Sequence, residues 1–177
     1  SFEYALLDAM LCLSEGDHTI LVGAADEAEG EGPLYNLQER LKNEDLYSTS
    51  GASFFVVSDE KPKGDSVKIV DIETIGLVEN LSKSIMAFFK ENQFSEDSLD
   101  LVLYAYSTAF TKEKLQEIFP EEVLFDYQQK SGSYFTNSAF ALQYAMDWLT
   151  VDENKGKRVL ICNNLIPENL GLVLLTS

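Results

Sequence analysis

Hydrophobic residues recur at helical spacing from the start of the chain. Between residues 2 and 15 they fall on one face of a predicted helix, at Ala5, Leu6, Ala9, Met10 and Leu13. Gly16 follows, in the position that typically ends a helix. A natural domain rarely opens in mid-helix without a cap, and the first residue is Ser1 instead of Met. We therefore expect a further segment upstream of this helix.

The rest of the chain alternates between strand-like and helix-like periods. The predicted strands are residues 19–23, 52–58, 67–75, 100–106, 122–125, 157–162 and 170–176. A helix is predicted over residues 80–92, with Leu81, Ile85, Phe88 and Phe89 facing inward, and a weak helix over residues 37–42 in an acidic surface segment. Thr111 is expected to cap a helix that ends at Ile118, and Asn137 to cap a later one.

From residue 67 the order is strand, helix, strand, helix, strand, helix, strand, strand. Such alternation is typical of an α/β fold with helices on the faces of its sheet. We predict a mixed, mostly parallel sheet that ends in an antiparallel hairpin. Residues 1–58 add only a helix and two strands, as if the beginning of another unit of the same kind were missing.

One predicted turn resembles the setting of an active site. The segment QKSGSYFTNSAFALQYAMDWL, residues 129–149, predicts a strand exit, a Ser-Gly turn and an amphipathic helix. The turn offers Ser131, Gly132, Ser133 and Tyr134, with no His, Lys, Asp or Glu to act as a general base. Two interpretations stay open: an inherited site that has lost its catalytic group, or ordinary punctuation between a strand and a helix.

The composition disfavours two classes of partner, nucleic acids and anionic lipids. The chain has 177 residues and a formal net charge of −17. A polyanionic surface repels nucleic acid phosphates and anionic lipid head groups. No apolar run approaches the length of a membrane span, and no signal peptide opens the sequence. Cys12 and Cys162 are interpreted as small core residues of a reducing, cytoplasmic compartment.

The remaining candidate sites favour no catalytic metal or cofactor. His18 is the only histidine, and we expect it to be solvated; a single His excludes a conventional two-His metal centre. Four acidic residues, Asp26, Glu27, Glu29 and Glu31, are interpreted as a solvated loop, since they lack the pattern of a calcium loop. Cys12 lies inside a predicted helix, where a thiol is a poor nucleophile. We predict no metal and no cofactor.

Two further motifs carry no chemistry by themselves. Gly30 and Gly32 are followed by Pro33 with no strand close before them, so they do not form a phosphate-binding loop. Ser107 and Ser133 have no His–Asp relay, so a hydrolase is unsupported.

Several segments, taken in order, resemble the β-ketoacyl synthases of the thiolase superfamily. Residues 5–27 (ALLDAMLCLSEGDHTILVGAADE) resemble the helix after that family's nucleophile and the strand that follows it. The other similar segments are residues 51–57, with their strand after a glycine motif, residues 103–108 and 130–139, where the family carries its two catalytic His, and residues 163–174, where it carries its closing turn and last strand. The resemblance covers nearly the whole chain, and small ketosynthase-like proteins found beside aryl-polyene gene sets look most similar.

The departures from the family's motifs bear directly on activity. Position by position, Tyr106 stands where the first His belongs and Ser133 where the second belongs. The family's gating Phe turn becomes Asn164–Leu165–Ile166–Pro167, with only Asn169 kept. The nucleophile's own position would lie just before the first residue. The resemblance therefore implies no confirmed catalytic residue, and it marks Tyr106, Ser133, Tyr134, Leu165 and Asn169 as candidates for lining an acyl tunnel.

The resemblance implies a thiolase-like fold with one complete half, residues 67–177, and the C-terminal part of the other, residues 1–58. It favours a catalytically silent subunit of the chain-length-factor type, which partners a catalytically complete ketosynthase and meets the acyl carrier protein only indirectly. The alternative is an active acyl-carrier-protein-dependent synthase or acyltransferase that uses Tyr106, Ser133 and an upstream cysteine. An unrelated αβ binding module is the third interpretation.

Overall fold

The computed structural model describes residues 1–27, 49–106 and 109–177. Its main elements are α1 (Phe2–Ser14), β1 (Thr19–Asp26), β2 (Gly51–Ser58), β3 (Lys68–Gly76), α3 (Leu81–Glu91), β4 (Leu101–Tyr106), α4 (Ala109–Ile118), β5 (Leu124–Asp126), α5 (Gln128–Ser131), α6 (Ser138–Thr150), β6 (Arg158–Asn164) and β7 (Asn169–Thr176). Single 3-10 turns occupy Glu96–Ser98, Glu121–Val123 and Asp152–Asn154. The order from β3 to β7 is the predicted alternation of strands and helices.

The described strands form two sheets. β1 and β2 make an antiparallel pair, and the other five strands lie in the order β3-β7-β6-β4-β5. The larger sheet is mixed, as expected, and β6 and β7 form the predicted antiparallel hairpin. Only β4 pairs in parallel, with β5 and with β6, because β7 returns between β6 and β3 and runs antiparallel to both. Antiparallel pairing therefore takes a larger share than the sequence predicted.

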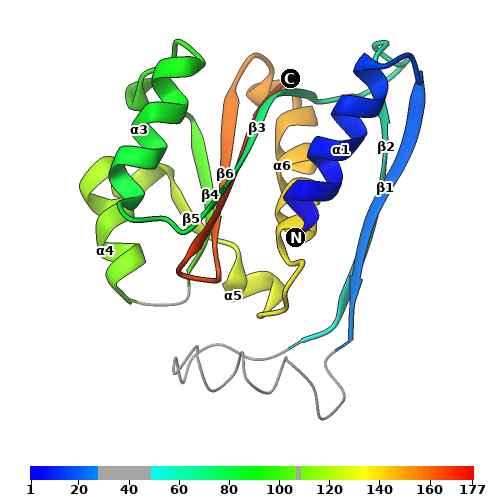
Figure 1. The fold of residues 1–177 in the computed structure, drawn as a ribbon. Coiled ribbons are helices and arrows are strands. Elements are labelled where there is room, and N and C mark those ends of the chain that lie inside the picture. The colour runs from blue at the N-terminus through cyan, green and yellow to red at the C-terminus, as the bar shows by residue number, and fades with distance from the viewer. Residues whose placement is uncertain (28–48, 107–108) are drawn as a thin grey trace.

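Helices and sheets alternate in layers across the molecule. Figure 1 shows the β1–β2 pair, then α1 and α6, then the five-stranded sheet, and finally α3 and α4 on the far side of that sheet. One apolar core lies on the α1 and α6 side of the large sheet and includes Phe2, Phe55 and Val173. A second core lies on the α3 side and includes Ile85, Phe89 and Leu172. The helix and two strands of residues 1–58 thus pack into the same core as β7.

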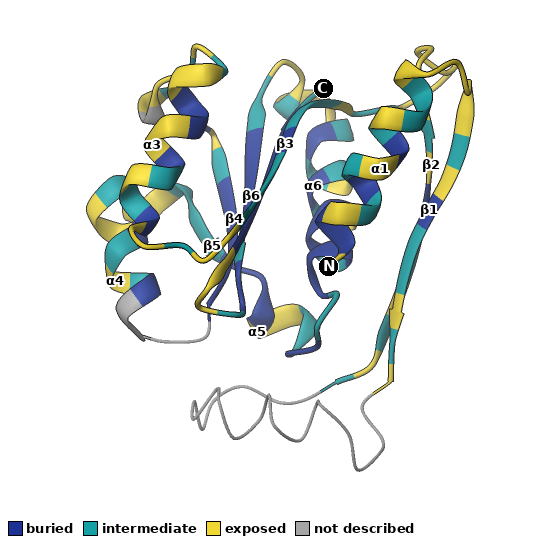
Figure 2. Ribbon diagram, viewed as in Figure 1, coloured by how far each residue is buried: buried dark blue, intermediate teal, exposed yellow. Residues whose placement is uncertain are grey.

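Burial follows this layering. Figure 2 shows buried residues along the centre of the large sheet and on the inward faces of its helices. The four residues predicted to face inward on α3 are all buried, and Asn80 caps that helix by accepting the backbone N–H of Lys83. On the outer face of the β1–β2 pair, Leu21, Phe54 and Val56 are exposed.

Two local predictions were wrong, and a third was right in position only. α4 begins at Ala109, so Thr111 lies inside it, buried, with its hydroxyl donating to Asn164 instead of capping. The predicted strand exit at Gln129 is the short helix α5, because the strand before it ends at Asp126. Asn137 does hold the N-cap position of α6, but its side chain makes no capping hydrogen bond.

Two other predicted segments differ in extent. β1 continues to Asp26, so the acidic surface segment begins later than expected. The weak helix predicted over residues 37–42 lies outside the described residues.

Candidate functional site

The two positions matched to the family's catalytic His lie at the ends of neighbouring elements. Tyr106 is the last residue of β4, and Ser133 lies in the turn between α5 and α6; both are buried. The backbone N–H of Tyr106 donates to Oε1 of Gln128 at 2.7 Å. Nε2 of Gln128 in turn donates to Oγ of Ser133 at 3.0 Å. A single buried carboxamide therefore joins the two positions.

Gln128 is held rigidly for this role. It is 2% exposed, it begins α5, and its backbone N–H donates to Oδ1 of Asp126 at 3.0 Å. Burial raises the pKa of Asp126, while the hydrogen bond from the Gln128 backbone opposes that rise. No sequence pattern singles out Gln128, because its partners lie 22 residues before it and 5 residues after it in the chain.

Tyr134 lies where the turn between α5 and α6 packs against the β1–β2 pair. It is buried, and a Cβ atom at Gly51 would lie 2.5 Å from its hydroxyl oxygen, so position 51 has no room for a side chain. Next to it, Oδ2 of Asp26 accepts both the backbone N–H and the hydroxyl of Thr136 at 2.7 Å. Burial, with a smaller contribution from Asp26, raises the pKa of Tyr134. Asp26, expected in a solvated acidic loop, instead ties β1 to the turn.

A depression of about 530 Å³ lies at this end of the β1–β2 pair. The residues that line it are Ala25, Asp26, Glu27, Ser50, Gly51 and Ala52. None of them is a residue that the sequence proposed for the acyl tunnel. Among the described residues, its lining offers two carboxylates and a hydroxyl group but no cation.

The β6–β7 turn carries the other two candidates. Leu165 is buried at its start, and Asn169 is exposed where β7 begins. Tyr106 and Asn164 are register partners in the parallel pairing of β4 with β6, so the turn begins directly beside Tyr106. The structure thus gathers Tyr106, Gln128, Ser133 and the start of this turn at the carboxyl ends of β4 and β6, whereas the side chain of Asn169 is solvated.

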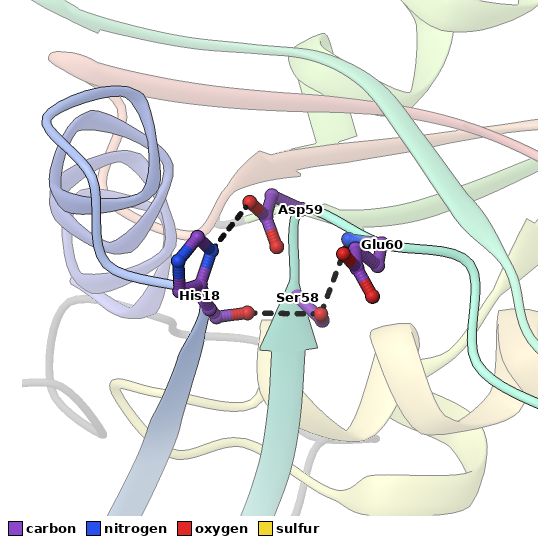
Figure 3. A network of polar contacts seen from close by, with 4 residues as sticks. All are labelled: His18, Ser58, Asp59 and Glu60. Carbon is purple, nitrogen blue, oxygen red and sulfur yellow. Dashed lines mark hydrogen bonds and ion pairs between the residues drawn. The ribbon is translucent and has the colours of Figure 1, made fainter.

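The only imidazole of the chain lies far from this site. His18 precedes β1, and its Nδ1 lies 3.0 Å from Oδ2 of Asp59 beyond the end of β2 (Figure 3). Ser58 completes the network by donating its hydroxyl to the His18 carbonyl oxygen at 2.9 Å. Asp26, which contacts the turn, is at the opposite end of β1, about 23 Å away along the strand.

His18 is solvated as expected, since its side chain is 81% exposed, but it has an ionic partner that the sequence did not reveal. The hydrogen bond to Asp59 and the charge of that carboxylate raise the pKa of His18.

The cysteines and the acidic side chains are the remaining candidates from the sequence. Cys162 is buried in β6, and burial raises the pKa of its thiol to about 12. Among the described residues, no group of three or more His, Cys, Asp and Glu side chains could hold a metal ion. Ser107, Glu29 and Glu31 lie outside the described part of the chain. Within that part, no helix is long and apolar enough to cross a membrane.

Comparison with known proteins finds similarity through structure alone. No family model matches the sequence, and no curated protein matches it. Among solved structures, the ishigamide ketosynthase/chain length factor superposes with a TM-score of 0.76 at 14% identity, over 99% of this chain and 54% of that one. Cerulenin-bound OleA from Xanthomonas campestris gives 0.74 at 14% identity, over 99% of this chain and 62% of that one.

A third similar structure is 3-oxoacyl-[acyl-carrier-protein] synthase III from Aquifex aeolicus VF5, with a TM-score of 0.61 and 17% identity, over 99% of this chain and 64% of that one. The chain thus spans roughly half to two thirds of the length of these proteins. The layers, the order of strands and these superpositions confirm the fold expected from the sequence: the chain has the thiolase-like fold of the ketosynthase-like proteins.

Proposed function

We propose that this chain is part of a catalytically silent, ketosynthase-like subunit of the chain-length-factor type, which partners an active β-ketoacyl synthase in polyene, polyketide or fatty-acid assembly. The observation that carries the proposal is the buried Tyr106–Gln128–Ser133 connection. By the resemblance of the sequence, Tyr106 and Ser133 stand at the two positions where that family carries its imidazoles.

The energetic argument concerns hydrogen-bond donors. Two neutral imidazoles bind the thioester carbonyl in that family, and one preorganised donor is commonly worth about 3–4 kcal/mol of barrier. Here Gln128 accepts the backbone N–H of Tyr106 and donates to Oγ of Ser133, and no imidazole stands at either position. The alternative, an active synthase, would have to use the phenol of Tyr106 and the short hydroxyl of Ser133 as donors in place of two imidazoles.

Surface charge supports indirect contact with the acyl carrier protein. Carrier proteins are acidic, and this chain has 30 acidic against 13 basic residues. One basic cluster, Lys155, Lys157 and Arg158, is already occupied: Lys155 pairs with Asp152, Lys157 lies over the Trp148 ring and Arg158 over the Phe94 ring. Because like charges slow the encounter of two polyanions, the carrier should dock on the more basic partner subunit.

We also propose that residues 1–58 are part of an incomplete first half of the fold. In our proposal residues 67–177 are a complete thiolase-like half, and residues 1–58 complete a first half whose other segments would cover the exposed apolar face of the β1–β2 pair. That face holds Leu21, Phe54 and Val56, which are 64–69% exposed, and water-exposed apolar clusters of this kind commonly mark a contact surface.

We also propose that the protein acts in the cytoplasm.

Co-purification tests the partnership. The affinity-tagged full-length protein should capture a ketosynthase encoded near its gene, whereas residues 1–177 alone should capture it poorly. The captured complex is identified by mass spectrometry, with the tag alone as control. Direct capture of the carrier protein by the full-length protein, with no ketosynthase present, would contradict the proposal.

A further inference from the structure

Strand β6 ends in two asparagines whose side chains reach opposite helix layers. Successive side chains of a strand point to opposite faces of the sheet. Accordingly Asn163 contacts Glu3 of α1 on one face, and Asn164 contacts Thr111 of α4 on the other. The turn between β6 and β7 follows immediately, so its start is attached to both layers.

The side chain of Asn164 binds backbone carbonyl groups inside the turn. Its Nδ2 lies 2.8 Å from the carbonyl oxygen of Asn169, 3.2 Å from that of Pro167 and 3.3 Å from that of Ile166. Its Oδ1 accepts the hydroxyl of Thr111 at 2.9 Å. The side chain is 3% exposed, so these bonds are made away from water.

Asn163 connects the same turn to the first turn of α1. Its Oδ1 accepts the backbone N–H of Leu165 at 3.2 Å, and its Nδ2 donates to Oε1 of Glu3 at 2.8 Å. Gly171 is the register partner of Asn163 on β7, and a Cβ atom there would lie 2.7 Å from Cγ of Glu3. The glycine thus leaves the room that the Glu3 side chain occupies.

Glu3 is an unusual choice for such a buried place. It is 1% exposed, and its Oε2 has no hydrogen-bond partner among the described residues. Burying a carboxyl group is unfavourable unless it is well paired, and an apolar side chain would fill the space at lower cost. Its position in the first turn of a helix offsets part of that cost. Among the described residues, the one hydrogen bond of its side chain is to Asn163, and holding that amide explains a carboxyl group in this position.

We propose that Glu3, Asn163 and Asn164 are positioning residues that hold the β6–β7 turn, and with it Leu165, as a fixed wall of the site. The inference rests on the proposed function, in which Leu165 stands in the turn that carries the gating Phe of the resembling family. With its first residues bonded to α1 and α4, this turn does not swing open to admit an acyl chain.

Amide hydrogen exchange of the full-length protein tests, residue by residue, whether Glu3, Asn163 and Asn164 hold the β6–β7 turn. The Leu165 and Asn169 amides should be protected in the parent protein. Glu3→Ala and Asn164→Ala should each accelerate exchange at Leu165 by about tenfold or more. Each variant removes either a hydrogen bond to a charged group or a set of backbone contacts, and the local stability lost with them corresponds to that acceleration. Glu3→Gln keeps an acceptor for Asn163 and should stay near the parent rate.

Asn169→Ala is the matched control, because it alters an exposed side chain of the same turn whose backbone carbonyl still binds Asn164. Amides in the middle of β7, such as that of Val173, report global unfolding and separate it from local opening of the turn. Equal acceleration of the turn and of β7 in Glu3→Ala would overturn the proposal, as would unprotected turn amides in the parent. The readout involves neither condensation nor a partner, so its failure is distinct from failure of the proposed function.

Discussion

Three side-chain amides complete backbone hydrogen bonding at the ends of β4 and β6. Gln128 accepts the last N–H of β4, while Asn163 and Asn164 bind the N–H and carbonyl groups of the β6–β7 turn. Buried backbone groups without partners cost about as much as a lost hydrogen bond, so each amide stabilises its strand end. At the residue scale, these three amides thus bind backbone groups and add no group that ionises near neutral pH.

The single histidine allows a residue-scale test of surface electrostatics. The imidazole signal of His18 should titrate above 6.5 in an NMR pH series, because the hydrogen bond and charge of Asp59 favour the protonated form. Since the folded-state pKa is the higher one, the stabilising contribution of the pair is fully present below pH 6.5 and is lost as the pH rises through the folded-state pKa.

Asp59→Asn should lower the titration midpoint of His18 towards 6.5, and Asp17→Asn should lower it less, since Asp17 contributes least to the rise. A midpoint at or below 6.5 in the parent protein, or one indifferent to Asp59→Asn, would contradict the geometry in Figure 3.

At the scale of elements, periodicity predicted what local sequence determines. The inward face of α3 and the order of strands and helices from β3 to β7 followed from apolar spacing. The errors arose where a residue far away in the sequence determines the contacts of a side chain. Thr111 looks like a helix cap, but its hydroxyl binds Asn164, which lies 53 residues further along the chain. The burial of Gln128 was not predicted, because a polar residue in a short helix is expected to be solvated unless its buried partners are known.

The candidate site was predictable only in part for the same reason. Tyr106 and Ser133 came from a resemblance, and the structure places both beside one buried carboxamide that no local pattern indicates. Leu165 is buried in the predicted turn, whereas the turn's attachment to α1 through Glu3 and Asn163 spans 160 residues of sequence.

Packing of α1 on the hairpin gives the element-scale prediction. Gly171→Ala should lower the free energy of unfolding in urea by about 1–3 kcal/mol, because the new Cβ atom would overlap the buried Glu3 side chain. Gly76→Ala on β3 is the control, since nothing lies within 4 Å of its added Cβ atom. The double variant Glu3→Ala with Gly171→Ala should lose less than the sum of the two single losses. Additive losses would mean that the two positions are not in contact.

At the scale of the whole molecule, layers and charge together favour an assembly partner over an isolated enzyme. Two cores on either side of one sheet hold residues 1–27, 49–106 and 109–177 together, while the outer face of the β1–β2 pair leaves apolar side chains in water. The net charge of −17 disfavours direct docking of an acidic carrier. The proposed subunit therefore depends on a second protein for both chemistry and delivery of substrate.

Malonyl-thioester decarboxylation by the full-length protein alone tests the proposed silence most directly. A catalytically complete ketosynthase assayed in parallel serves as the positive control. Our account predicts no carbon dioxide release above the uncatalysed background, because in our proposal Tyr106 and a Ser133 bonded to Gln128 stand in place of both imidazoles. Release above background that disappears in Tyr106→Phe or Ser133→Ala would contradict it and identify an active enzyme.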